Sequence, residues 1–222
     1  AAAEMSAGGA AVEFIQVDVT SKESQQALFD DVVSRYGRVD TVLAAAGVSS
    51  SGYISGEVSE VEADPEERMF HNRALDDWEQ VMAVNVTGVM LTNQIAIQHM
   101  LAKQTKGSIV NIASIAGRRP LPGASDYCVS KAAVIMLTKT VATEYSTLDI
   151  RVNAIGPGFI ETPMTANIRQ SPEWMEIVMQ MTPMQRMGQA SEIASTALFL
   201  ASDESSYFNG QTLFPNGGMF VG

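Results

Sequence analysis

The stretch VEFIQVDVTSKESQQALFDDVVSRYGRVDTVLAAAG, residues 12–47, contains the pattern from which the fold can be predicted. Two short apolar runs, VEFIQVDV (12–19) and VDTVLAAAG (39–47), flank the amphipathic segment QQALFDDVVSRYG (25–37). Short apolar runs are typical of buried strands, and helical spacing of apolar residues is typical of a helix that covers a sheet. We therefore expect a strand, a helix and a second strand.

The same alternation continues to the end of the chain. We expect a long helix over about residues 76–103, a helix beginning near Ser125 and another over about 192–201, with strands in GSIVNIAS (107–114), DIRVNAIGPG (149–158) and GQTLFPNGG (210–218). Alternating strands and helices are typical of βαβ units. The pattern predicts an α/β fold with a doubly wound parallel sheet, and the length and composition fit one domain, residues 1–222.

Ligands of such sheets bind beyond the carboxyl ends of the strands. The residues that follow the expected strands at this edge are Asp18 and Thr20, Ala44 to Gly47, Ser114, and Pro157 with Gly158. The sequence therefore predicts one site formed by four loops.

Composition excludes several classes of function. A net charge of -11 and a pI near 4.6 argue against nucleic-acid binding. The single cysteine, Cys128, and two isolated histidines predict neither an internal disulfide nor a metal site, which suits the cytoplasm. No apolar run reaches the roughly 18 residues that cross a bilayer, and the N-terminal residues lack the regions of a signal peptide, so we expect no membrane contact.

Two segments interrupt the alternation. Residues 48–68 are rich in Ser, Gly and Glu, and we expect a long surface loop there. Residues 161–188 contain many of the 13 methionines and two helical pieces between prolines. This segment is either a cap on the core or a flexible substrate lid, for which the adaptable methionine side chain is well suited.

Tyr127 and Lys131 lie four positions apart in SDYCVSKAAV, residues 125–134. On a helix they would share one face, so that the ammonium could act on the phenol. Taken alone, such a pair is more often an ordinary surface pair, because this spacing arises often by chance. Its context is more specific, because Ser114 comes thirteen positions earlier.

With these residues in place, the chain resembles the short-chain dehydrogenase/reductase family. The similarity continues through VDVT (17–20), AAAG (44–47), VNVTG (84–88), GSIVNIASIAG (107–117), RVNAIGPGFIETPM (151–164) and GQTLFPNGG (210–218), in the family's order from about Val12 onward. The resemblance implies a Rossmann-like fold and an NAD(P)-dependent oxidoreductase that interconverts a carbonyl and a secondary alcohol by hydride transfer.

The resemblance also implies the catalytic roles. Tyr127 would exchange a proton with the substrate oxygen, and Lys131 would lower the pKa of the phenol, ordinarily near 10, and hold the nicotinamide ribose. Ser114 would hydrogen-bond the substrate oxygen. Asn85 would anchor a water chain to the lysine, although a helix-interior asparagine bonded to backbone is the simpler interpretation of that residue.

For the cofactor, NAD or NADP, the resemblance implies contacts along the same edge. Asp18 and Val19 would meet the adenine, although Asp18 is also a plausible cap. The remaining cofactor residues that it implies are Ala44, Ala45, Gly47, Tyr127, Lys131, Pro157, Gly158, Ile160 and Thr162. The family often has asparagines where this chain has Ala44 and Ala45, which leaves only backbone contacts there.

The chain contains no G-x-G-x-x-G and no T-G-x-x-x-G-x-G phosphate loop. By the resemblance the sequence starts just before the family's third strand, so the fold would lack its first two strands, about 45 residues. Either the sequence is part of an ordinary enzyme, or it is a truncated relative that serves as a catalytically inactive binding or assembly protein. We expect a small or medium-sized carbonyl or alcohol as substrate, and a homotetramer or dimer. The sequence identifies neither the substrate nor the choice between NAD and NADP.

Overall fold

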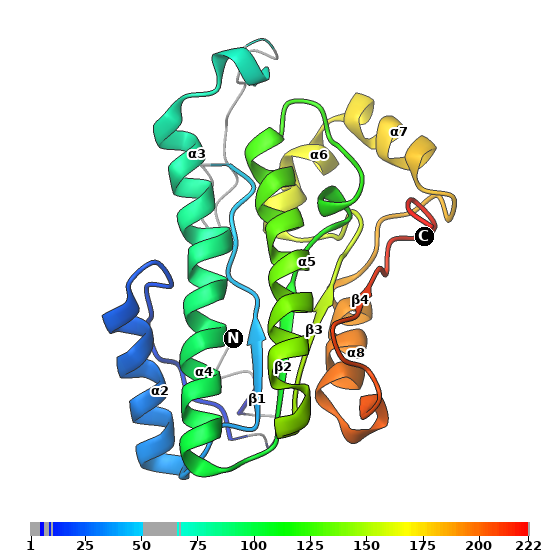
Figure 1. Cartoon of the computed structure of the whole chain (residues 1–222). Coiled ribbons are helices and arrows are strands. Elements are labelled where there is room, and N and C mark those ends of the chain that lie inside the picture. The colour runs from blue at the N-terminus through cyan, green and yellow to red at the C-terminus, as the bar shows by residue number, and fades with distance from the viewer. Residues whose placement is uncertain (1–4, 7–8, 10, 51–65, 67, 222) are drawn as a thin grey trace.

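The sheet is parallel, as predicted. The computed structural model describes residues 5–6, 9, 11–50, 66 and 68–221 (Figure 1). Within these residues the sheet has four strands in the order β1-β2-β3-β4, namely β1 (Thr41–Ala44), β2 (Gly107–Ile112), β3 (Ile150–Ile155) and β4 (Thr212–Leu213). Ala44 pairs with Asn111, which pairs with Ala154. The carboxyl ends of the first three strands therefore meet at one edge.

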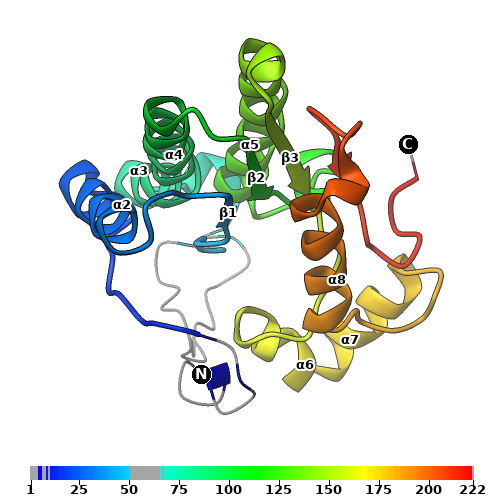
Figure 2. The ribbon, with the colours of Figure 1, turned by 90° about the horizontal axis from the view of Figure 1, so that it is seen from below.

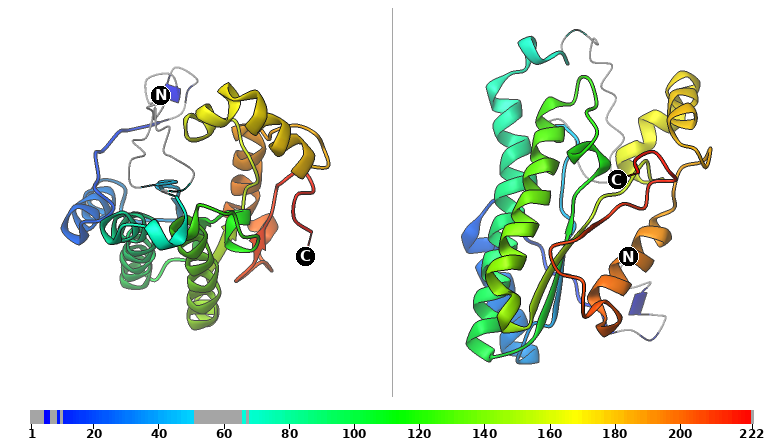
Figure 3. Two further views of the ribbon diagram at one scale, coloured as in Figure 1. Left: turned by 90° about the horizontal axis from the view of Figure 1, so that it is seen from above. Right: turned by 45° about the vertical axis from the view of Figure 1, so that its right-hand side comes forward.

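Helices cover both faces of the sheet. The helices are α2 (Lys22–Tyr36), α3 (Leu75–Met82), α4 (Val89–Lys103), α5 (Ser125–Tyr145), α6 (Ala166–Gln170), α7 (Pro172–Met181) and α8 (Ala190–Ala201). Figure 2, which looks along the strands, shows α2, α4 and α5 in one layer and α8 on the opposite face. Helices α6 and α7 lie on the side of α8, as both views of Figure 3 show. The two-sided arrangement confirms the predicted fold class.

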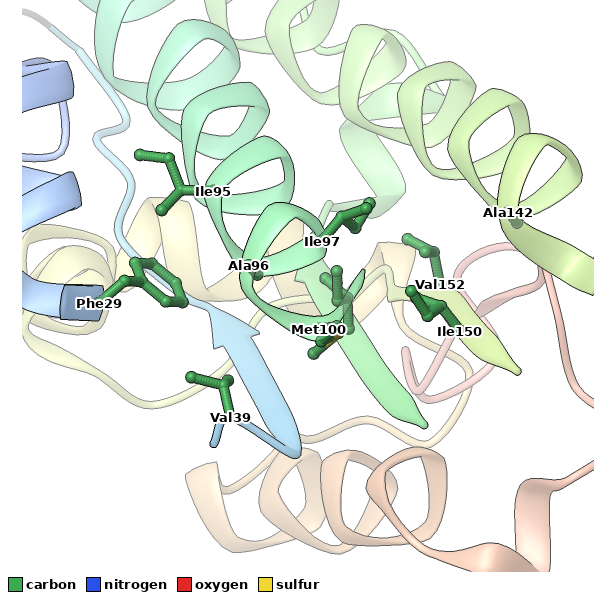
Figure 4. Close-up of a cluster of buried hydrophobic side chains, with 10 residues drawn as sticks. Phe29, Val39, Ile95, Ala96, Ile97, Met100, Ala142, Ile150 and Val152 are labelled. Atoms are coloured by element: carbon green, nitrogen blue, oxygen red, sulfur yellow. The ribbon is translucent and has the colours of Figure 1, made fainter. Parts of the chain in front are cut away.

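A buried apolar cluster joins the α2, α4 and α5 layer to the sheet (Figure 4). Ile95, Ala96 and Met100 project from α4 and are completely buried. They meet Phe29 of α2 and Val152 of β3. This packing anchors α2, α4 and α5 on the sheet, and the candidate site residues lie toward its carboxyl edge.

The strand predicted over residues 12–19 is wrong. The segment forms no ladder with any described strand, and Phe14 is 81% exposed. Backbone becomes a strand only where a neighbouring strand takes its N–H and C=O groups. Here the end of the segment bonds to α2 instead, since Asp18 N donates to Ser24 Oγ and Val19 O accepts from Gln25 Nε2.

The helix predicted over 76–103 is interrupted. Between α3 and α4 the chain forms a π-helical segment, Ala83–Gly88, which widens the helix without ending it. Helices α6 and α7 match the two helical pieces predicted in 161–188. Most of the loop predicted over 48–68 lies outside the described residues. In the described part of the chain, no helix has both the length and the apolarity needed to span a membrane.

Candidate active site

Asn85 lies in the π-helical segment and is completely buried. Its Oδ1 accepts from Val48 N at 2.8 Å, and its Nδ2 donates to Val48 O at 2.9 Å and to Ser130 Oγ at 3.1 Å. The amide therefore joins the loop after β1 to α5. Because π-helical turns interrupt the regular ladder and are frequent at functional sites, the placement of Asn85 there favours a role beyond packing.

Tyr127 and Lys131 lie one turn apart on α5, as predicted, and Lys131 Nζ is 5.7 Å from the centroid of the Tyr127 ring. Lys131 is buried, and its Nζ donates to Ile112 O, at the end of β2, at 2.9 Å. Burial lowers the pKa of Lys131 from 10.5 to about 8. The ammonium is still mostly protonated at neutral pH and lies beside the phenol.

Ser114 follows β2 and precedes a 3-10 turn, Ile115–Gly117 (η3), that packs against α5. Its Oγ accepts from Ala116 N at 3.1 Å, which fixes the side chain. Burial raises the pKa of Tyr127, and a hydrogen bond with the Ser114 side chain acts in the opposite direction. The Ser114 side chain therefore lies within hydrogen-bonding reach of Tyr127.

The loops after β1 and β3 adjoin this cluster. Ala44 is buried at the end of β1, and Ala45 is exposed beyond it. A Cβ on Gly47 would lie 3.3 Å from both Asn85 Oδ1 and Lys131 Nζ, so the backbone passes close to both groups. Pro157 O accepts from Ile115 N at 3.1 Å, which ties the loop after β3 to the Ser114 turn.

The other predicted cofactor residues lie farther along the edge. Gly158 packs closely on Asn216, Ile160 is buried, and Thr162 begins the segment that leads into α6. Asp18 and Val19 lie on the turn before α2, where Thr20 donates to Asp18 Oδ1 from its N–H and its hydroxyl. These bonds lower the pKa of the exposed Asp18 carboxyl.

The sequence reading missed two groups of the site. Ser130 connects Asn85 to α5, and its Oγ donates to Tyr127 O at 2.8 Å; its position three residues after Tyr127 on a predicted helix was a usable signal. Arg73 Nη1 lies 3.5 Å from Asp126 Oδ2 in a largely buried ion pair beside Tyr127. No spacing in the sequence pointed to that pair.

The free donors of Lys131 fit a nicotinamide dinucleotide. The Lys131 ammonium carries three N–H donors, and among the described residues Ile112 O is the acceptor it reaches. Two donors thus remain for ribose hydroxyls. At Gly47 the absence of a side chain keeps Lys131 Nζ from being crowded, because a Cβ there would lie 3.3 Å from it.

Known proteins resemble this chain in sequence and in structure. The family model described as enoyl-(acyl carrier protein) reductase matches residues 1–220. The 3beta-hydroxysteroid dehydrogenase 1 of Eggerthella lenta is 40% identical over 213 residues, which cover 96% of this chain and 75% of that protein.

Two solved structures are also similar. A short-chain type dehydrogenase/reductase from Mycobacterium marinum is 29% identical with a TM-score of 0.87, covering 100% of this chain and 80% of that one. A gluconate 5-dehydrogenase from Burkholderia cenocepacia, in complex with NADP and tartrate, is 30% identical with a TM-score of 0.83, covering 98% of this chain and 79% of that one.

Proposed function

The chain belongs to the short-chain dehydrogenase/reductase family and is an NAD(P)-dependent oxidoreductase, and from this premise we propose that Tyr127 exchanges the proton when a carbonyl and a secondary alcohol are interconverted. The observation that carries the proposal is the buried Lys131 ammonium 5.7 Å from the Tyr127 ring centroid. A phenol beside a desolvated cation is a better proton donor and acceptor than a free phenol.

The chain's own residues handle the substrate oxygen and its proton. A bound nicotinamide cofactor supplies or accepts the hydride. In reduction, the Tyr127 hydroxyl gives its proton to the oxygen that becomes the alcohol; in oxidation, the same oxygen takes the proton back. The Ser114 hydroxyl, fixed by Ala116 N, donates a hydrogen bond to the substrate oxygen and steadies it against Tyr127.

Lys131 stabilises the phenolate that forms when Tyr127 loses its proton, and it binds the nicotinamide ribose with its remaining donors. Asn85 holds Val48 and Ser130 in place around the lysine. It also anchors a chain of water molecules through which protons reach Lys131. Asp18 and Val19 contact the adenine; Ala44, Ala45 and Gly47 let backbone approach the cofactor; and Pro157, Gly158, Ile160 and Thr162 face the nicotinamide.

The substrate is a small molecule with a carbonyl or secondary alcohol, enclosed by a lid formed by residues 161–188. The exposed side chains of Trp174 (54%) and Ile177 (43%) on α7 support a lid with an apolar surface. The single domain works as a homotetramer or dimer. Its α5 helix supports this, because Val129, Ala132 and Met136 form one exposed stripe of apolar side chains at helical spacing.

Tyr127→Phe tests the proposal. It removes the transferable proton and keeps the ring, so kcat should fall by about a hundredfold or more while the dissociation constant for NADH or NADPH changes little. Stopped-flow turnover and fluorescence titration measure the two quantities. Tyr145→Phe, near the end of the same helix, is the matched control. Near-normal turnover of Tyr127→Phe would contradict the proton role. A wild-type protein that neither binds NADH or NADPH nor turns over a substrate would favour a binding or assembly protein.

A further inference from the structure

Gln25 is a buried polar residue of α2 with 2% exposure. Its Nε2 donates to Val19 O at 2.6 Å and to Gly88 O at 3.1 Å, while its Oε1 accepts from Thr92 Oγ1 at 2.7 Å. Both amide hydrogens and the amide oxygen are therefore used. The side chain bridges three segments: the turn before α2, the π-helical segment and α4.

The two carbonyls that Gln25 joins belong to different parts of the site. Val19 directly follows Asp18, and Gly88 closes the π-helical segment that contains Asn85. The contact between them is also tight, since a Cβ on Gly88 would lie 3.1 Å from Val19 Cγ2 and 3.2 Å from Val19 O. The position of the Asp18–Val19 turn is thus set against the segment that holds Asn85.

An apolar side chain would suit the packing of α2 on α4 better. The interface next to Gln25 is formed by Phe29 and Ile95, both buried. Burying an amide and the Thr92 hydroxyl there costs free energy that their hydrogen bonds roughly recover, with little net gain in stability. Unlike an apolar pair, Gln25 and Thr92 form directional hydrogen bonds, and these fix the position of the Val19 carbonyl.

We propose that Gln25 is a positioning residue for cofactor binding, which holds the Asp18–Val19 turn at the distance from the π-helical segment that the adenosine half of the dinucleotide requires. The inference rests on the proposed contact of Asp18 and Val19 with the adenine. Thr92 supports it by holding the Gln25 amide in the orientation that points both hydrogens at the carbonyls.

Gln25→Glu tests the inference with almost no change in shape. The carboxylate would face two carbonyl oxygens without a proton to donate, so the turn should shift away from Gly88. We expect the dissociation constant for ADP-ribose to rise about tenfold, the effect of one hydrogen bond of about 1.4 kcal/mol. The dissociation constant for nicotinamide mononucleotide, which has no adenosine, should stay within about twofold. Isothermal calorimetry measures both.

Gln26→Glu is the matched control. It places the same charge on the next residue of α2, where the side chain contacts Asp30 and His99 rather than Val19 or Gly88. We expect it to bind ADP-ribose as the wild type does. Thr92→Val introduces no charge and removes one anchor of the amide, and it should weaken ADP-ribose binding in the same direction by about threefold.

Hydrogen–deuterium exchange gives a reading without any nucleotide. Peptides covering residues 18–21 and 86–89 should exchange faster in Gln25→Glu, while β2 and β3 keep their protection. Equal loss of affinity for ADP-ribose and nicotinamide mononucleotide, or unchanged exchange and affinity, would overturn the inference. Asp18→Ala tests separately whether Asp18 contacts the adenine. If Asp18→Ala weakens ADP-ribose binding and Gln25→Glu does not, Gln25 has no positioning role. If Asp18→Ala leaves ADP-ribose binding unchanged, the assignment of Asp18 to the adenine fails.

Discussion

Lys131→Met should change how the stability of the protein depends on pH. Lys131 is buried, and burial lowers its pKa from 10.5 to about 8. The folded state therefore disfavours the ammonium, and the destabilisation is fully present below about pH 8. As pH rises toward 10.5, the unfolded chain also loses its proton and the destabilisation disappears. The stability of the wild type should thus rise through this interval relative to the variant.

The magnitude follows from the two pKa values. The gap of about 2.5 between them corresponds to about 3 kcal/mol at neutral pH, at about 1.4 kcal/mol for each pKa unit. Between pH 7 and pH 9.5, the free energy of unfolding of the wild type should rise by about 2 kcal/mol relative to that of Lys131→Met. The variant also leaves Ile112 O without its donor, but this cost does not depend on pH and leaves the slope unchanged.

Urea unfolding at intervals from pH 7 to pH 9.5, followed by circular dichroism, measures the difference. Lys139→Met, on the same helix, corrects for the loss of one positive charge. Parallel curves for the wild type and Lys131→Met would refute the reasoning, because they would mean that Lys131 binds its proton equally well in the folded and unfolded states. The reasoning would also be refuted if the wild type lost stability relative to Lys131→Met as the pH rises from 7 to 9.5.

Two further predictions concern helix α5. Arg73→Ala should destabilise the protein by about 3 kcal/mol, because it leaves the buried Asp126 carboxylate unpaired, and Arg73→Ala with Asp126→Asn should recover part of the loss in urea unfolding; an equally unstable double variant would contradict the ion pair. Met136→Glu should lower the mass found by light scattering at micromolar concentration, because it places a charge in the exposed apolar stripe of α5; a wild type that is already monomeric would refute the assembly.

The sequence predicts helices and strands correctly where the spacing of apolar residues matches the residues that the fold buries. The helices α2, α5 and α8 and the strands β1 to β3 fall within or close to the predicted ranges, because each has the periodicity of the element it forms. The segment 12–19 has an equally good pattern, but a strand also needs a neighbour for its backbone. Sequence periodicity contains no information about whether that neighbour is present.

The site shows the same division. Tyr127 and Lys131 were predicted to share a face, since their spacing fixes it once the helix is given. The contacts of Asn85 with Val48 and Ser130 depend on a π-helical turn, which shifts side-chain directions in a way that helical spacing does not reveal. Gln25 did leave a signal: it precedes Phe29 by four positions on the apolar face of α2, where an amide is out of place.

Lys131 shows why such misplaced residues mark function. Its cation lies beneath the carboxyl edge of the sheet, and in the described part of the chain no carboxylate comes within ion-pair distance of it. A buried charge without a counter-ion weakens a fold, and an apolar residue there would pack at lower cost. The ammonium therefore has no use in folding that would balance the roughly 3 kcal/mol of destabilisation. This is what the proposed function requires of Lys131: a cation held ready for the phenolate that forms on Tyr127, with N–H donors left for the hydroxyls of a bound ribose.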